Sequence, residues 1–372
     1  MSATEGPHNR PNDLARSLLR HPLGGEAADG GLVIAILGPT GVGKTEVAAR
    51  VALELGVRVI SCDSMQIYRG FPVLTNQPGE AGAAGSVRHE LVAVAEPQEE
   101  WSAAAYARRA QALIDEDIAA TGWAVISGGT GLYMRAALAP LAMARPCDPE
   151  RRAALERLAA NEGPERMHER LAAAAPEVAE KIHPHNVRRV VRALEVIEAG
   201  GAEGWSERRD LWRPEYRHPT LVVVLAVDRT VLYERIERRA REMVRSGAVE
   251  EVERHRALQS RAGAPPPSGS GGPAEVASTL GAPASPPRGV ERAIGYRELA
   301  AYLDGRISRD EAIASLAAAT RRYARRQVTW VRKLGDADII DTSERSPQET
   351  SAEVLQEAYA LRRIPPTEPD VG

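Results

Sequence analysis

The chain has few cysteines, few aromatic residues, almost no lysine and no long hydrophobic run. Its two cysteines, Cys62 and Cys147, cannot form a disulfide framework or, by themselves, a zinc site, which is typical of a reducing compartment. No apolar stretch approaches membrane-spanning length, and the N-terminus lacks the apolar core of a signal peptide. The sequence therefore predicts a cytoplasmic protein that has no membrane as a partner.

Lysine occurs only at Lys44, Lys181 and Lys333, so nearly all of the 48 basic residues are arginine. This bias makes any arginine cluster weaker evidence for a nucleic-acid site, and the net charge of −3 does not by itself indicate one. The same bias gives weight to Lys44, because a compact ammonium occupies a position where phosphate chemistry favours one.

The length and composition are those of an ordinary globular protein. With 372 residues, of which 43% are hydrophobic and 27% charged, the chain can bury a full core. We expect two domains, or one domain with a sizeable insertion.

Residues 38–45 read GPTGVGKT, which is the spacing of a phosphate-binding P-loop. The apolar run 32–37 precedes it as a buried strand should, and residues 46–55 follow with helical periodicity. The glycines let backbone N–H groups close around a di- or triphosphate, and the Thr45 hydroxyl can reach Mg²⁺ as a metal ligand. The predicted phosphate-binding residues are Gly38, Pro39, Thr40, Gly41, Val42, Gly43, Lys44 and Thr45.

Two further strands are predicted to end near this loop. Residues 57–62 lead to Asp63, and residues 123–127 lead to a glycine turn that contains Thr130. In open α/β sheets function gathers at the carboxyl ends of strands, so we expect Asp63 beside the P-loop, although a helix N-cap also explains a lone aspartate. The second strand lacks the aspartate that many P-loop NTPases place there, which favours a transferase or kinase over a hydrolase.

The pattern of elements predicts an α/β protein, a P-loop NTPase-like parallel sheet flanked by helices with an inserted helical domain. A long amphipathic helix is expected at 230–258, and the helix at 320–333 interleaves basic residues with Tyr323 and Trp330, which makes it a nucleic-acid candidate. The expected divisions are a disordered tail at 1–30, a catalytic core at 31–144 and 220–343, a helical insertion at 145–219, a low-complexity insertion at 259–289 and a C-terminal tail at 344–372.

Six separated stretches together resemble one family. In chain order they are GPTGVGKT, SCDSMQIYRG, GGTGLYMRA, NVRRVVRALEV, AIGYREL and TRRYARRQVTWVRK. This order resembles the tRNA dimethylallyltransferase family, whose members prenylate the adenine next to the anticodon. The resemblance runs from about residue 32 to residue 333, apart from the low-complexity stretch.

The resemblance implies a reaction and roles for particular residues. A dimethylallyl group would pass from dimethylallyl diphosphate to the exocyclic N6 amine of the adenosine 3′ of the anticodon, releasing diphosphate, with Mg²⁺ at Thr45. Asp63 would be the general base, and Thr130 and Arg239 would support the leaving diphosphate. The protein would act as a monomer on the tRNA anticodon stem-loop. Contacts to tRNA would come from Asp63, Ser64, Met65, Gln66, Thr130, Arg152, Arg188, Arg189, Val190, Val191 and Arg192.

The chain departs from the family pattern at residues 71–78 and at Arg88-His89, and the first departure lies near the expected base site. For the helix that carries Arg188 and Arg192, a solvated basic face is an alternative to RNA binding. Rival functions are an adenylate isopentenyltransferase that acts on free nucleotide, a small-molecule P-loop kinase, and an RNA-binding module with a vestigial P-loop.

Overall fold

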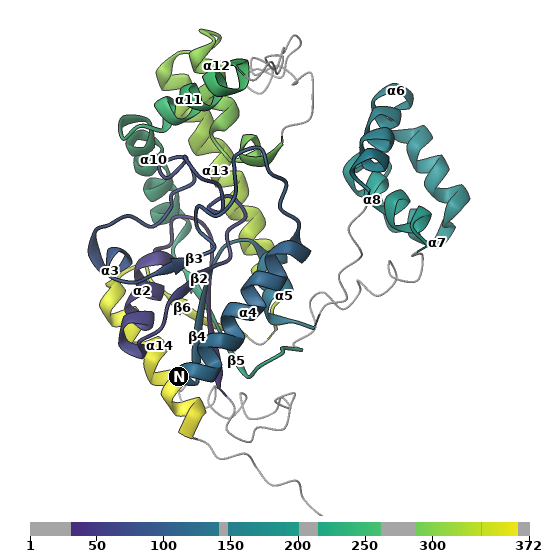
Figure 1. Cartoon of the computed structure of the whole chain (residues 1–372). Helices are drawn as coiled ribbons and strands as arrows, with labels where there is room; N and C mark the ends of the chain where they lie inside the picture. The colour runs from purple at the N-terminus through teal and green to yellow at the C-terminus, as the bar shows by residue number, and fades with distance from the viewer. Residues whose placement is uncertain (1–30, 141–147, 201–214, 262–287, 336, 364–372) are drawn as a thin grey trace, which may run out of the picture.

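The computed structural model describes residues 31–140, 148–200, 215–261, 288–335 and 337–363 (Figure 1). The expected N-terminal tail and most of the low-complexity insertion lie outside these ranges. Among the described helices, none has both the length and the apolar character needed to cross a membrane.

A six-stranded parallel sheet forms the centre of the molecule, in the order β3-β2-β4-β1-β5-β6. The predicted α/β sheet of P-loop type is confirmed. The edge strand β3 was not predicted, because two residues are too few to show a pattern; it follows the short helix α3 (Gly82–Gly85). The strands are β1 (Leu32–Leu37), β2 (Val59–Ser61), β3 (His89–Glu90), β4 (Trp123–Gly128), β5 (Thr220–Ala226) and β6 (Asp338–Asp341).

Helices cover both faces of the sheet, so its central strands are apolar along their whole length. Alternate residues of β1 show this: Val33 and Ala35 pack into the core on one face, and Ile34 and Ile36 pack into the core on the other. The covering helices are α4 (Ala103–Thr121) and α5 (Gly131–Leu138) on the first face, and α2 (Lys44–Leu55) and α14 (Pro347–Arg363) on the second.

The stretch expected to be a C-terminal tail is a helix over most of its length. α14 extends to Arg363, and its Val354 and Ala358 are fully buried against the sheet and α2. The apolar positions recur at helical spacing, but the prolines and acidic residues around them obscured the pattern. This correction places the middle of α14 in the core, while the last described residues are exposed.

A layer of helices follows β5 and continues after the low-complexity stretch. The single helix expected at 230–258 is two helices, because the chain turns at Gly247, whose φ of +111° favours glycine. The second helix continues to Arg261, three residues into the expected insertion. The layer consists of α10 (Arg229–Arg245), α11 (Ala248–Arg261), the 3₁₀ turn η3 (Gly289–Arg292), α12 (Tyr296–Leu303) and α13 (Arg309–Val331).

Three helices between β4 and β5 pack around a core of their own, which contains Met167, Leu171 and Val190. Figure 1 shows them as a group to one side of the sheet. The first helix is kinked where Gly163 leaves helical geometry and Pro164 follows. The helices are α6 (Pro149–Ala174), α7 (Pro176–Ala179) and α8 (Val187–Glu198).

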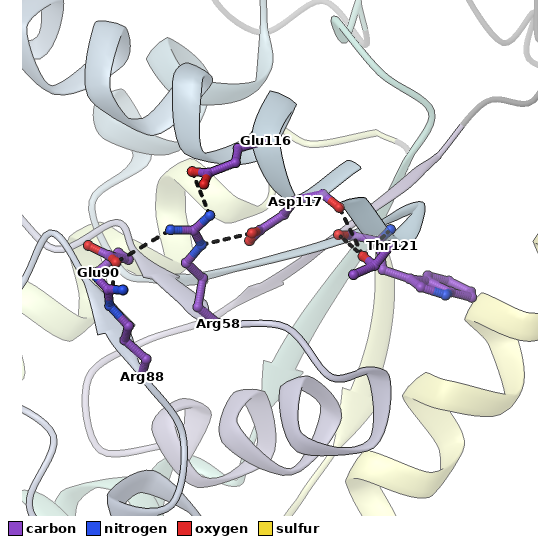
Figure 2. Close-up of polar contacts among 7 residues, drawn as sticks. Arg58, Arg88, Glu90, Glu116, Asp117 and Thr121 are labelled. Atoms are coloured by element: carbon purple, nitrogen blue, oxygen red, sulfur yellow. Dashed lines mark hydrogen bonds and ion pairs between the residues drawn. The ribbon is translucent and has the colours of Figure 1, made fainter. Parts of the chain in front are cut away.

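An ion-pair network holds the edge strand β3 against β2 and α4 (Figure 2). Arg58, which directly precedes β2, lies 2.8 Å from Asp117, 2.7 Å from Glu116 and 3.5 Å from Glu90. Arg88 pairs with the same glutamate at 2.7 Å. The departure from the family pattern at Arg88 therefore falls in a structural network at the amino end of the strands.

Candidate active site

The P-loop lies between the end of β1 and the start of α2, as the sequence predicts. Gly38, Gly41 and Gly43 all have positive φ, and Gly43 is the N-cap of α2. At Gly38 a Cβ would lie 2.5 Å from the carbonyl oxygen of Leu225 on the neighbouring strand, so only glycine fits there. The loop consequently closes around a helix N-terminus, where backbone N–H groups can bind phosphate.

Lys44 is partly buried at this loop. Its Nζ donates a hydrogen bond to the carbonyl oxygen of Pro39 at 2.8 Å. Burial lowers the pKa of the ammonium to about 8, which nearby Asp63 opposes and Arg239 reinforces. The site therefore holds a cation that lacks a carboxylate hydrogen-bond partner among the described residues, and a bound diphosphate would stabilise it.

Asp63 follows β2 and lies in the same cavity as Lys44, as the strand order requires. Its Oδ1 accepts a hydrogen bond from the backbone N–H of Met65 at 2.9 Å, which fixes the turn. The helix N-cap considered as an alternative is not observed, because no helix begins at this turn. The carboxylate faces a space where it can accept a proton.

Thr130 joins the Asp63 turn to the turn after β4. Its N–H donates to the carbonyl of Cys62 at 3.2 Å, and its hydroxyl accepts from the N–H of Ser64 at 3.1 Å. Thr130 lies beside the cavity rather than in its lining. The carboxyl ends of β2 and β4 are thus held together where Asp63, the predicted general base, lies next to Thr130, the predicted diphosphate contact.

Among the arginines of α10, Arg239 makes the contact that singles it out. Its Nη1 lies 3.5 Å from the Thr40 hydroxyl of the P-loop, and burial lowers its pKa, with Asp63 opposing that shift. Arg235 and Arg238 also line the cavity. The hydrogen bond to the P-loop distinguishes Arg239, the arginine that the family resemblance implies, from these two neighbours.

The loop at 71–78, which departs from the family pattern, is built into the site. The Gln66 side chain donates to the carbonyl of Asn76 at 2.7 Å, and Gln77 donates to the carbonyl of Gln66 at 3.1 Å. From α11, the buried Glu251 carboxylate accepts two backbone N–H groups of the loop at 2.8 and 2.9 Å. The loop is therefore anchored at both ends, and it presents Asn76 to the cavity.

Helix α13 contributes one cavity residue, Gln327, that sequence reasoning missed. Gln327 lines the cavity, and Tyr323 lies beside Thr130; burial raises the pKa of this tyrosine, and Asp63 adds to the rise. Trp330 packs against Gly131. Tyr323 therefore faces the site and Trp330 packs on the turn after β4, and the stacking of these rings on nucleic acid stays a prediction. The spacing 323, 327 and 330, one face of a helix, was the available signal.

The predicted RNA contacts on α8 of the helical group differ in exposure: some side chains are buried and others are exposed. Val190 and Val191 are buried in its core, so their side chains support the helix and do not reach RNA. Arg188 and Arg189 are exposed, whereas Arg192 pairs with the buried Glu195 at 2.8 Å.

Arg152 also approaches Glu195, at 3.5 Å. Desolvation lowers the pKa of Arg188, and the positive charges of Arg292 and Arg152 lower it further. Arg292 belongs to η3, so basic residues of the helical group and of the core lie within electrostatic range of each other. None of these arginines lines the cavity.

The cavity has a volume of about 600 Å³, which is in the range of small-ligand sites. The predicted P-loop residues, Asp63 and Arg239 come together there. The described residues contain no group of three or more His, Cys, Asp or Glu side chains suited to a metal. Thr45 and one or two carboxylates can still supply part of an oxygen shell, which is how Mg²⁺ is usually held when substrate phosphates complete it.

Fold and cavity together define the class: a P-loop α/β enzyme in which the P-loop and two partly buried cations share a cavity with a carboxylate. Residues 66–334 match the family model described as IPP transferase. The chain belongs to the IPP transferase family.

Individual relatives agree with this assignment. A tRNA dimethylallyltransferase of Geobacillus thermodenitrificans is 40% identical over 314 residues, which cover 84% of this chain and 91% of that protein. The crystal structure of a tRNA isopentenylpyrophosphate transferase from Bacillus halodurans is 30% identical, covers 90% of this chain and 100% of its own, and has a TM-score of 0.58. A eukaryotic dimethylallyltransferase acting on tRNA, 23% identical, shares the fold with a TM-score of 0.70 and covers 91% of this chain and 81% of its own.

Proposed function

We propose that this protein transfers the dimethylallyl group of dimethylallyl diphosphate to the N6 amine of the adenosine 3′ of the anticodon in tRNA, releasing diphosphate. The observation that carries the proposal is one cavity in which Lys44 and Arg239 lie at the P-loop opposite the Asp63 carboxylate. Membership of the IPP transferase family supports the same reaction. A P-loop without an acid at the end of β4 suits a diphosphate that leaves rather than one that water attacks.

In the proposed step the bond between the allylic carbon and the diphosphate oxygen breaks while a bond from N6 to that carbon forms. Asp63 takes the proton that the amine loses, which a weakly nucleophilic aromatic amine requires. The P-loop N–H groups, Lys44 and Arg239 stabilise the charge that develops on the leaving diphosphate. Thr130 fixes the Asp63 turn through Ser64 and supports the diphosphate side of the cavity.

Mg²⁺, held by the Thr45 hydroxyl together with diphosphate oxygens and water, would neutralise negative charge on the leaving group. The metal ligand that the protein itself would supply is the Thr45 hydroxyl, which lies in the first turn of α2 next to Lys44 in the sequence.

The enzyme would act as a monomer in the cytoplasm. Its tRNA substrate would bind across both the helical group and the core. The division into a catalytic core and a helical insertion at 145–219 belongs to this proposal. Arg188 and Arg189, both exposed, would contact the phosphates of the anticodon stem-loop, and the target base must leave its stack to reach Asp63.

The test of the reaction is incubation with labelled dimethylallyl diphosphate and either unmodified tRNA or AMP. We expect label on the N6 of one adenosine in tRNA and none in AMP. Label in AMP would favour the free-nucleotide alternative, and phosphate transfer from ATP without prenyl transfer would favour the kinase. Asp63→Asn should lower the transfer rate by about 10²–10⁴-fold while donor binding persists.

A matched control for that variant is Asp304→Asn. This aspartate is ion-paired with Arg256 at 2.6 Å outside the cavity, and its loss should leave the transfer rate unchanged. Full activity of Asp63→Asn would contradict the general-base role.

Arg189→Glu should weaken tRNA binding and lower the salt dependence of log K by about one for each phosphate that the helix no longer neutralises. The control is Arg166→Glu, an exposed arginine on α6 in the same helical group. Equal salt slopes for wild type and Arg189→Glu would mean that this face is merely solvated.

A further inference from the structure

The side chain of Gln327 bridges two loops of the candidate active site. This residue of α13 is 2% exposed. Its Oε1 accepts a hydrogen bond from the N–H of Thr40 in the P-loop at 2.8 Å, and its Nε2 donates to the carbonyl of Gly129 at 2.8 Å. A backbone N–H can only donate and a carbonyl can only accept, so the orientation of the amide is set by its partners.

The turn after β4 is shaped to receive this helix. A Cβ at Gly129 would lie 2.0 Å from the Gln327 Nε2, and a Cβ at Gly131 would lie 2.7 Å from the Trp330 ring. Glycine at both positions lets α13 approach the turn that carries Thr130. The amide of Gln327 is therefore the point at which this helix reaches both the turn and the P-loop.

We propose that Gln327 is a positioning residue, whose amide fixes the P-loop at the spacing from the Gly129 turn that the transfer reaction requires. The inference rests on the proposed function. Through Thr130 and Ser64 the same turn holds the Asp63 side of the site. Gln327 thus sets the distance between the loop that binds the diphosphate and the turn that carries the base, and small displacements of reacting groups carry large rate penalties.

Other residues already give the P-loop its shape, which separates this role from simple stability. Gly38, Gly43 and the hydrogen bond from Lys44 to Pro39 all lie within the loop or its strand. Loss of the Gln327 amide should therefore leave the loop able to bind diphosphate, but at the wrong distance from Asp63. The expected signature is a lower kcat with little change in the KM for the donor.

Replacement by glutamate gives a test with a distinctive pH dependence. Ionised, the carboxylate of Gln327→Glu would face the Gly129 carbonyl with two acceptors and no proton between them. Protonated, the same side chain would accept from Thr40 and donate to Gly129 as the amide does. Burial favours the protonated form, so lowering the pH should restore the bridge.

The experiment compares transfer rates of wild type, Gln327→Glu and Gln327→Met on unmodified tRNA from pH 6 to pH 8.5. We expect Gln327→Met to lose about 10- to 100-fold in kcat at every pH. The deficit of Gln327→Glu relative to wild type should shrink by roughly tenfold or more toward pH 6 as its carboxyl takes up a proton. The other titratable groups that line the cavity are present in both proteins and cancel in this ratio: Lys44, Glu46, Asp63, Arg235, Arg238, Arg239 and Glu242.

Gln111→Glu is the matched control. Gln111 on α4 also donates its side-chain amide to a backbone carbonyl, that of Ala136 at 2.9 Å, but it lies outside the cavity. The ratio of the transfer rate of Gln111→Glu to that of wild type should stay constant with pH. A constant ratio for Gln327→Glu, or an unchanged kcat for Gln327→Met, would overturn the positioning role.

A second measurement does not depend on activity. Hydrogen exchange at the Thr40 amide should be faster in Gln327→Met than in wild type, because its acceptor is gone. Faster exchange together with unchanged kcat would mean that the bridge exists without positioning the reaction. If wild type transferred no prenyl group, the proposed function would fail by itself, and the exchange result would still decide whether the bridge exists.

Discussion

Strand β2 has a charged cluster at each of its ends, and the two clusters differ in how their charges are paired. At the amino end Arg58 contacts three carboxylates, from Asp117, Glu116 and Glu90. At the carboxyl end Asp63 shares a cavity with Lys44, whose ammonium donates to a backbone carbonyl. Cations are thus partly buried at both ends of β2, but among the described residues Arg58 has carboxylate ion-pair partners whereas Lys44 and Arg239 have none.

The pKa values of the cations separate the two clusters. Burial would lower the pKa of Arg58, but its hydrogen bonds to Asp117 and Glu116 outweigh burial and raise it. Burial lowers the pKa of Lys44 and of Arg239, and no ion pair within the described part of the chain reverses either shift. A buried cation without a matching anion costs stability and is typical of a site that binds one. The difference therefore predicts a structural role for the charges at the amino end of β2 and ligand binding by those at its carboxyl end.

The largest effect should come from removing the lysine of the site. Lys44→Met deletes the charge nearest the proposed diphosphate, so we expect the transfer rate to fall by about 10³-fold. The free energy of unfolding should stay the same or rise, because a desolvated ammonium is replaced by an apolar side chain of similar size. Steady-state kinetics and thermal unfolding measure the two effects.

Lys181→Met is the control for the lysine prediction, since Lys181 is exposed on the helical group. It should change neither quantity. If Lys44→Met lost stability as well as activity, Lys44 would belong to the same structural class as Arg58, and the comparison would fail.

At the amino end of β2 we expect the opposite outcome, a loss of stability with activity retained. Arg58→Met leaves the buried Asp117 without its cation, so we expect a loss of about 3 kcal/mol in the free energy of unfolding and an unchanged kcat. Burial raises the pKa of Asp117 even with Arg58 beside it. The folded state therefore takes up a proton before the unfolded state as pH falls, and the deficit should be smaller at pH 5 than at pH 8. Chemical denaturation at both pH values measures it.

Arg88→Met, which removes a mostly exposed arginine from the same network, is the control and should change stability by less than about 0.5 kcal/mol. A deficit for Arg58→Met that grew toward acid pH would contradict the role of Asp117.

The difference between the two ends also explains what could be predicted from the sequence. The P-loop, Asp63 and Thr130 lie in short segments with a local spacing, and each directly follows an apolar strand, so pattern alone located them. Gln327 lies 287 residues from Thr40 along the chain, and although it shares a helix face with Tyr323 and Trp330, that spacing does not show which loops the face contacts. The Arg58 network was missed for the same reason, because its partners become neighbours only when the sheet forms, whereas α14 was missed because prolines and acidic residues obscure its periodicity.

The smallest predicted effect is a pH dependence of donor binding that belongs to the carboxyl end alone. The pKa of Lys44 is about 8 without ligand, and a bound diphosphate raises it by stabilising the ammonium. Below pH 8 the ammonium is already charged, so affinity for dimethylallyl diphosphate should not depend on this group. Above pH 8 binding must take up a proton, and affinity should fall by up to about tenfold per pH unit. Calorimetry in two buffers of different ionisation enthalpy would measure the uptake of that proton.

Arg58→Met should show the same dependence of donor affinity on pH as wild type, and Lys44→Met should lose the fall in affinity above pH 8. A flat wild-type curve from pH 7.5 to 9.5 would mean that Lys44 already has its anion within the protein.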